Sequence, residues 1–160
     1  MPEAAAHTGD REAVRLWLQI YQTAGLIEQR IRSRLTQEFG VSLARFDLLA
    51  ALVREDKPMT MGALSRRLLV SNGNVTGLIS RLVDDGLVTR TADPDDRRIM
   101  IIELTAKGQR DFDEMASAHA SWLNEFIGAA DPELTHRLRD DLGALRRHMN
   151  PTEDRTPDAS

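Results

Sequence analysis

Short polar or small residues gather on the outer face of one expected helix near the middle of the chain. They are Ser71, Asn72, Gly73, Asn74, Thr76, Gly77, Ser80 and Arg81. An asparagine amide can pair with two atoms on the edge of an adenine, and a hydroxyl group can donate or accept a hydrogen bond. Glycine lets a base or a backbone come close, although it weakens the helix. This composition predicts a face that can enter a groove of DNA.

The same run also has a purely structural interpretation. Asn72-Gly73-Asn74 could be only a turn with a helix cap, since Asn and Gly are common at such places. Turn chemistry does not explain why polar or small residues continue at Thr76, Gly77 and Ser80. The whole run therefore favours the hypothesis of groove contact.

Two arginines follow a short turn that is rich in aspartate. The turn is Asp93-Pro94-Asp95-Asp96, with Arg97 and Arg98 after it, and proline with flanking aspartates is typical of a turn between two strands. Arginines at the tip of a hairpin can enter a minor groove or bind phosphates. The alternative is a solvated turn in which these charges pair with one another for little energy.

Charge is unevenly divided along the chain. The whole chain has a formal charge of −4, yet residues 57–108 hold eight basic residues against six acidic ones. An acidic scaffold with a mildly basic middle suits a protein that docks one face on phosphates. Arg66 and Arg67 lie in this segment as candidate phosphate contacts, although exposed helical arginines are more often ordinary surface residues.

Hydrophobic spacing and capping residues indicate the elements that must position these side chains. Apolar residues recur at helical spacing over 11–39, 46–53, 61–69, 75–83, 112–126 and 134–145. Strand-forming runs cover 87–92 and 98–104, on either side of the aspartate-rich turn. Gly40 and Gly86 are expected to stop helices, and Ser42 and Thr105 to cap the next ones. The expected order is four helices, a hairpin and two helices.

The third and fourth helices are short and are joined by Leu69-Val70-Ser71, with the hairpin directly after them. This is the layout of a winged helix-turn-helix. The expected fold class is mainly α (α+β), with the winged helix-turn-helix over 43–105 and dimerisation helices over 11–39 and 106–148. They form a single unit over 11–150, between a flexible N-terminus at 1–10 and a disordered tail at 151–160.

A resemblance to a known family is strongest over residues 64–108. That segment contains LSRRLLVSNGNVT at 64–76, GLV at 86–88, DPDDRR at 93–98 and LTAKG at 104–108. With these motifs at this spacing, the chain resembles the MarR family of bacterial regulators over roughly residues 14–148. The resemblance implies that Arg98 is the wing arginine that enters the groove and that Asp96 orients it. Many members have an arginine where this chain has Gly77, so their operators do not transfer to it.

The first helix and the last two helices carry more apolar surface than one small winged domain can cover. This excess predicts packing on a second copy. The resemblance implies the same, a two-fold homodimer whose interleaved terminal helices place two recognition helices in successive major grooves of double-stranded DNA. The alternative is a helical bundle within one chain.

The resemblance also implies a small-molecule effector, usually an anionic aromatic or lipophilic compound bound between the dimer helices and the winged domain. The candidate ligand-binding residues are Tyr21, Arg30, Arg34, His119 and Trp122. Each has a plainer explanation, since the rings lie on packing stripes and the arginines can simply be exposed. The runs SNGNVTG at 71–77 and HASW at 119–122 are similar to the branch that senses aromatic carboxylates or their coenzyme A thioesters.

Other classes of protein find little support in the sequence. No catalytic motif or phosphate-binding loop is present, so neither an enzyme nor a cofactor is expected. Cysteine is absent, and His136 and His148 are twelve residues apart, which disfavours a metal site. No apolar run is long enough to span a membrane and no secretory signal is evident, so a cytoplasmic location without membrane contact is expected.

The sequence as a whole predicts a sequence-specific DNA-binding transcriptional regulator. The expected form is a ligand-responsive repressor that binds a palindromic operator as a homodimer. The alternative function is a protein-interaction or metal-sensing regulator with weak DNA binding.

Overall fold

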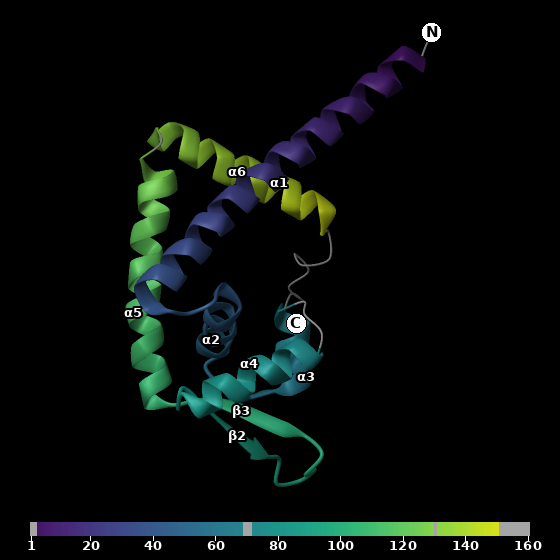
Figure 1. Ribbon diagram of the computed structural model, residues 1–160. Helices are drawn as coiled ribbons and strands as arrows, with labels where there is room; N and C mark the ends of the chain where they lie inside the picture. The colour runs from purple at the N-terminus through teal and green to yellow at the C-terminus, as the bar shows by residue number, and fades with distance from the viewer. Residues whose placement is uncertain (1–2, 69–71, 130, 151–160) are drawn as a thin grey trace, which may run out of the picture. The chain divides into compact units, whose positions relative to one another are not determined.

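The computed structural model describes residues 3–68, 72–129 and 131–150, and its elements follow the expected order (Figure 1). The helices are α1 (Glu3–Phe39), α2 (Leu43–Glu55), α3 (Met61–Leu68), α4 (Asn72–Asp84), α5 (Ala106–Leu123) and α6 (Pro132–Met149). The strands are β1 (Met59–Thr60), β2 (Val88–Ala92) and β3 (Met100–Leu104), and a π-helix, η1 (Asn124–Gly128), follows α5. The predicted fold class is confirmed.

Local signals in the sequence set most of the helix ends. Gly40 and Gly86 adopt positive φ angles of 65° and 71°, a conformation that glycine takes without a steric penalty. The Ser42 and Thr105 hydroxyls each accept a hydrogen bond from the amide three residues further on, at 3.4 and 2.9 Å. These four predicted stops and caps are confirmed.

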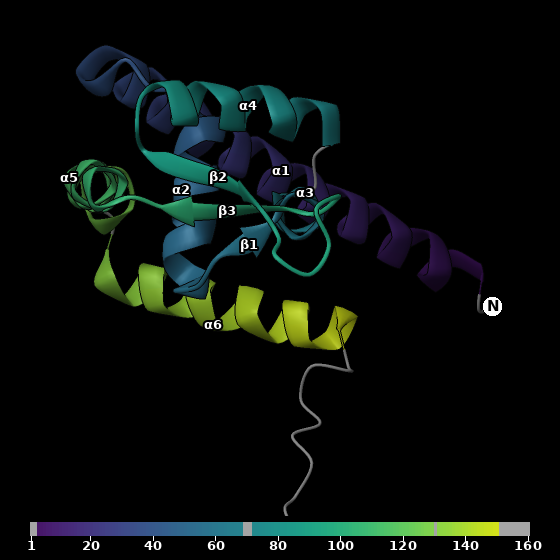
Figure 2. The same cartoon turned by 90° about the horizontal axis from the view of Figure 1, so that it is seen from below.

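The sheet contains a strand that the sequence did not predict. Its order is β1-β3-β2, all antiparallel, with Val88 opposite Leu104 and Met59 opposite Ile102. Figure 2 shows β1 alongside β3 on the side away from β2. A strand of two residues after Pro58 has no periodicity to detect, and only its pairing with a distant strand defines it.

The bounds of the first helix and of the second hairpin strand differ from the prediction. The first helix begins at Glu3 rather than residue 11, so the segment expected to be flexible is helical from residue 3. The second hairpin strand begins at Met100 rather than residue 98, because the Ile99 amide donates to the Asp96 carbonyl and closes a turn there. The predicted linker residue Ser71 and tail at 151–160 lie outside the described residues.

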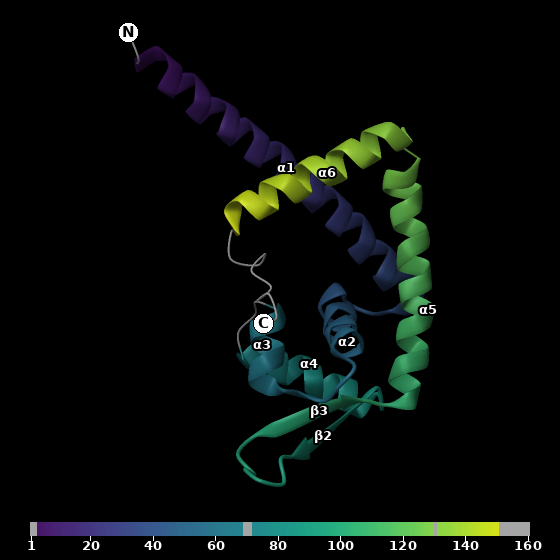
Figure 3. The same ribbon diagram turned by 180° about the vertical axis from the view of Figure 1, so that it is seen from behind.

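The core that supports the polar face is apolar and contributed by several elements. Its most deeply buried side chains are Leu35, Leu48, Leu49, Leu64, Val75, Ile79, Leu82, Val88 and Ile102. Each of these large side chains stabilises the fold by about 1.5–3 kcal/mol relative to an exposed position. Figure 3 shows α2, α3, α4 and the β2–β3 hairpin gathered around this region.

The chain consists of two compact units. The first ends at His119 and the second begins at Ala120. The first contains α1 to β3 and most of α5, and the second contains the end of α5, η1 and α6. The single unit expected over 11–150 stays a prediction. Within the described residues, no helix is long and apolar enough to cross a membrane.

Candidate nucleic-acid interface

Helix α4 has a buried face and a solvent face, although Val83, which was expected to point inward, is 38% exposed. Val75, Ile79 and Leu82 are completely buried against the core. The opposite face carries exposed residues from the predicted set, namely Thr76, Gly77, Ser80 and Arg81. The buried stripe therefore fixes which way these polar residues point. Asn72 and Asn74 belong to the first turn of the helix, but their side chains lie outside the described structure, as does Ser71.

Gly77 lies in the middle of α4, where a glycine is costly. A Cβ added there would meet nothing within 4 Å. Packing inside the protein therefore does not require glycine at this position, and alanine would favour the helix by about 1 kcal/mol. The surface around Gly77 is open, so a partner's backbone or base could approach it closely.

The turn between β2 and β3 is ordered by its own aspartates. The Asp93 carboxylate accepts hydrogen bonds from the amides of Asp95 and Asp96 at 2.8 and 3.2 Å. Proline between these residues fixes the first turn angle. The turn therefore places Arg97 and Arg98 in a defined position at the tip, and both side chains are exposed.

Arg98 and Asp96 form a two-pronged pair at this tip. The Asp96 carboxylate accepts from Arg98 Nε at 3.0 Å and from Nη2 at 2.9 Å, and also from the Arg98 backbone amide at 3.0 Å. These hydrogen bonds lower the pKa of Asp96 and raise the pKa of Arg98. The Arg98 side chain is 91% exposed, so Asp96 orients the guanidinium while leaving one side of it open to a partner. That Arg98 enters a groove of DNA from this position stays a prediction.

The two predicted arginines of α3 are placed differently from each other. Arg67 Nη2 lies 3.3 Å from Glu55 Oε1 at the end of α2, which ties α3 to α2. Arg66 is exposed, and its guanidinium lies 3.7 Å from the position of a Cβ on Gly62. Arg67 can reach a phosphate only by sharing or leaving Glu55, whereas Arg66 is the more available cation of the pair.

The candidate effector residues have different local surroundings. Tyr21 is exposed and stacks on Trp17 of the same helix, with ring centroids 5.7 Å apart. Arg34 Nη1 lies 3.7 Å from Glu38 Oε1, and Arg30 is exposed. Trp122 belongs to the second unit, and its side chain is buried. The prediction that these residues share a ligand site stays a prediction.

His119 lies in a group of residues whose other members the sequence did not single out. Its ring lies 5.0 Å from that of Phe46, which also stacks on Phe112 at 5.5 Å. Burial lowers the pKa of His119, partly offset by the negative charge of Asp47. Burial and the charge of Glu28 raise the pKa of Asp47, while His119 lowers it. Helices α1, α2 and α5 thus bring three titratable groups together, which no spacing in the sequence signals.

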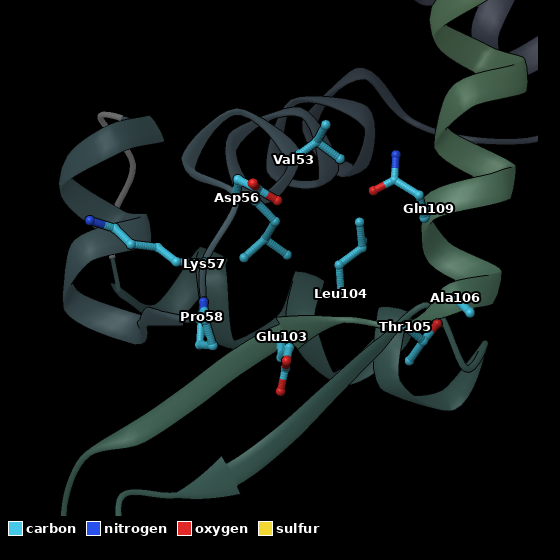
Figure 4. Close-up of a pocket in the computed structure, with 10 residues that line it drawn as sticks. Val53, Asp56, Lys57, Pro58, Glu103, Leu104, Thr105, Ala106 and Gln109 are labelled. Carbon is cyan, nitrogen blue, oxygen red and sulfur yellow. The ribbon is translucent and has the colours of Figure 1, made fainter.

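An open cavity of about 280 Å³ lies elsewhere, between the end of α2, β3 and the start of α5 (Figure 4). Leu52, Val53 and Leu104 supply its apolar lining, with Asp56 and Gln109 among its polar residues. Figure 4 shows Leu104 pointing toward α2 and Glu103 pointing off the opposite side of β3. None of the five predicted effector residues lines this cavity.

Together, the paired helices α3 and α4 and the three-stranded wing define a winged helix-turn-helix protein. No group of three or more His, Cys, Asp or Glu side chains that could hold a metal occurs among the described residues. In helix-turn-helix proteins the second helix of the pair, which is α4 here, is the one that lies in the major groove.

Comparisons with known proteins agree with this class. Residues 39–99 match the model of the MarR family. The transcriptional activatory protein BadR of Rhodopseudomonas palustris is 33% identical over 130 residues, which cover 79% of this chain and 74% of the relative. The chain belongs to the MarR family, and it is a DNA-binding transcriptional regulator rather than an enzyme.

Solved structures show the same fold. A MarR family transcriptional regulator from Silicibacter pomeroyi is 33% identical with a TM-score of 0.74, over 88% of this chain and 96% of that one. Sco3205 from Streptomyces coelicolor, solved in complex with DNA, is 21% identical with a TM-score of 0.73 over 92% and 93% of the two chains.

Proposed function

We propose that this protein binds a palindromic operator as a homodimer, with α4 in the major groove and the β2–β3 turn on the minor groove or phosphates. Asn72, Asn74, Thr76, Ser80 and Arg81 would contact bases or backbone from α4, together with Ser71 before it. Arg97 and Arg98 would act from the wing, and Arg66 and Arg67 from α3.

The single observation that carries this proposal is the open surface around Gly77. No neighbour within 4 Å fills the place of a side chain there, and glycine weakens the helix by about 1 kcal/mol relative to alanine. On a face of short polar side chains, such an open glycine lets the backbone or bases of an external partner come close. The residues around it, Thr76 and Ser80, are of the type that contacts base edges.

Dimerisation is supported by apolar side chains that the single chain leaves exposed. They are Val14, Leu16, Trp17, Leu18, Tyr21 and Leu26 on α1, and Leu134, Leu138 and Leu142 on α6. Exposed apolar stripes of this kind on each helix are expected to be covered by a partner, most simply by a second copy. A two-fold dimer would then bind half-sites about 34 Å apart, one turn of DNA.

The regulator is proposed to respond to a small molecule, an aromatic carboxylate or its coenzyme A thioester. Members of this family often bind small effectors, and the chain has no cysteine for a thiol switch. Arg30 and Arg34 would attract the carboxylate, and Tyr21, His119 and Trp122 would contact the ring.

We further propose repression, because a dimer seated across two major grooves blocks a promoter that overlaps its site. The Rhodopseudomonas relative is named an activatory protein, so a reporter assay must be able to detect activation as well as repression.

Gly77→Ala tests the proposal by separating stability from binding. DNA that binds the purified protein is first selected from a random duplex library and sequenced, which gives the cognate site. Gly77→Ala should then raise the free energy of unfolding by about 0.5–1 kcal/mol and weaken cognate binding by about 1–3 kcal/mol.

Gly25→Ala is the matched control, since it replaces another helical glycine with nothing within 4 Å. It should stabilise α1 without changing DNA affinity, and sedimentation would show that its assembly is unchanged. If Gly77→Ala bound the selected site as tightly as the wild type, α4 would not lie against the bases.

A further inference from the structure

Three charged residues lie at helix ends where the helix dipole opposes their charge. Arg45 is in the first turn of α2, Lys107 is in the first turn of α5, and Asp85 follows the last residue of α4. Cations are disfavoured at helix N-termini and anions at C-termini. Residues that break a local rule usually have a partner elsewhere in the fold that compensates for the cost.

All three residues meet at the end of α4. Arg45 Nη2 donates to Asp85 Oδ2, across forty positions of sequence. Lys107 Nζ donates to the Asp85 carbonyl oxygen at 2.8 Å. Each cation thereby interacts with the negative end of α4, which offsets the unfavourable dipole of its own helix.

The next two carbonyl oxygens are bound from the start of α5 as well. The Thr105 hydroxyl donates to the carbonyls of Gly86 and Leu87, at 2.8 and 3.1 Å. The Thr105 amide also donates to the Leu87 carbonyl at 3.0 Å. Three consecutive carbonyls at the end of α4 are therefore bound by two residues at the beginning of α5.

Arg45 is an energetically unfavourable residue at this position in the fold. Its side chain is 17% exposed, and its buried Nε has no hydrogen-bond partner in the described structure. An arginine buried with one donor unsatisfied lowers stability unless its ion pair compensates. Simple stabilisation of the fold is thus a poor explanation for Arg45, whereas fixing the direction of α4 is a better one.

We propose that Arg45 and Lys107 are positioning residues which hold the end of α4, through Asp85, at the tilt that lets its outer face match cognate base pairs. The proposal rests on the proposed role of α4 in base contact. Neither residue has to touch DNA. Because α5 runs on from this junction, a displacement of α5 would reach α4 through the same hydrogen bonds.

The test measures selectivity, defined as the ratio of affinities for the selected cognate duplex and a scrambled duplex of equal length. In the full-length protein, Arg45→Gln and Asp85→Asn should each lower this ratio about three- to tenfold, and the double variant should lower it no further. Arg45→Lys, which keeps the charge, should recover part of the loss. Hydrogen exchange should become faster at the amides of 85–87 and stay unchanged in the buried turns of α4.

Asp84→Asn is the matched control, because it removes the same charge from the adjacent position at the same helix end. It should leave selectivity unchanged. The proposal is overturned if Asp85→Asn and Asp84→Asn behave alike, or if Arg45→Gln lowers the unfolding midpoint and both affinities equally. A wild type without preference for any duplex would instead contradict the proposed function, and the positioning role would fail with it.

Discussion

The segment from α2 to β3 and the two terminal helices differ in where they place their apolar side chains. Between α2 and β3, most large apolar residues are buried, with Val83 and Ile99 as exceptions, and the polar residues of α4 face outward. On the first half of α1 and along α6, large apolar residues such as Trp17 and Leu138 remain exposed. The first region covers most of its apolar surface and can offer a polar face to DNA, whereas the exposed apolar surface of the terminal helices is what a second copy would cover in the proposed dimer.

The prediction with the largest expected effect compares how the stability of each region depends on protein concentration. Leu82→Ala empties a completely buried position, so it should lower the free energy of unfolding by about 2–5 kcal/mol at every concentration. Leu138→Ala should instead weaken association, because its side chain is half exposed in the single chain. Its melting temperature should fall mainly in dilute samples.

Urea unfolding and sedimentation of both variants at two protein concentrations would check this contrast. If the wild type sedimented only as an 18 kDa monomer at micromolar concentration, the comparison between the two regions would no longer imply a dimer.

A second prediction concerns the place where the wing meets α5. A Cβ on Gly108 would lie 2.0 Å from the Leu87 carbonyl oxygen, which is backbone and cannot rotate away. Gly108→Ala should therefore destabilise the protein by about 1–3 kcal/mol, as overpacked positions do. Circular dichroism melts can be compared with Gly143→Ala on α6, which meets only the end of a flexible arginine. A melt of Gly108→Ala like that of the wild type would mean that the backbone can move apart there.

A third prediction distinguishes the two parts of the DNA surface by the kind of defect. Asn74→Ala should lose about 1–3 kcal/mol on the cognate site and little on random DNA. Arg98→Ala should weaken both, and should flatten the plot of log affinity against log salt by roughly one unit for each phosphate that the protein no longer neutralises. Inserting about five base pairs at the centre of the operator should abolish binding, because it turns the half-sites to opposite faces of the duplex.

Fluorescence anisotropy across a salt series would measure these defects, with sedimentation of each variant as the control for folding. Should folded, dimeric Asn74→Ala and Arg98→Ala both bind like the wild type, the polar face of α4 and the wing would have been assigned wrongly.

The smallest effect is a pH dependence at the junction of α1, α2 and α5. The pKa of Asp47 is raised in the folded protein by burial and by Glu28. Ionised Asp47 therefore lowers stability, and this loss disappears as the pH falls through the folded pKa toward the ordinary value of 3.8. Asp47→Asn should be more stable than the wild type near neutral pH, and the two should converge in acid.

Urea unfolding between about pH 4 and pH 8 would measure this difference, with the exposed Asp84→Asn as the control. A gain of stability that stayed constant over this range would contradict the ionisation of Asp47 as its cause.

Some features could be predicted from the sequence because their causes are local. The stops at Gly40 and Gly86 depend on the conformational freedom of glycine, and the cap at Thr105 on a hydroxyl three residues from its donor. Of the apolar stripe that was expected to face inward on α4, Val75, Ile79 and Leu82 are buried as predicted, whereas Val83 is exposed. The inward stripe also determined which residues of α4 lie on its outer face.

Other features depend on which distant segments meet, and the tertiary structure alone decided them. β1 exists because Met59 and Thr60 pair with β3, more than forty residues away in the chain. Arg45 pairs with Asp85, and His119 interacts with Phe46 and Asp47. No local spacing indicates any of these contacts. Periodicity reports which face of a helix is buried, but it carries no information on what lies against that face.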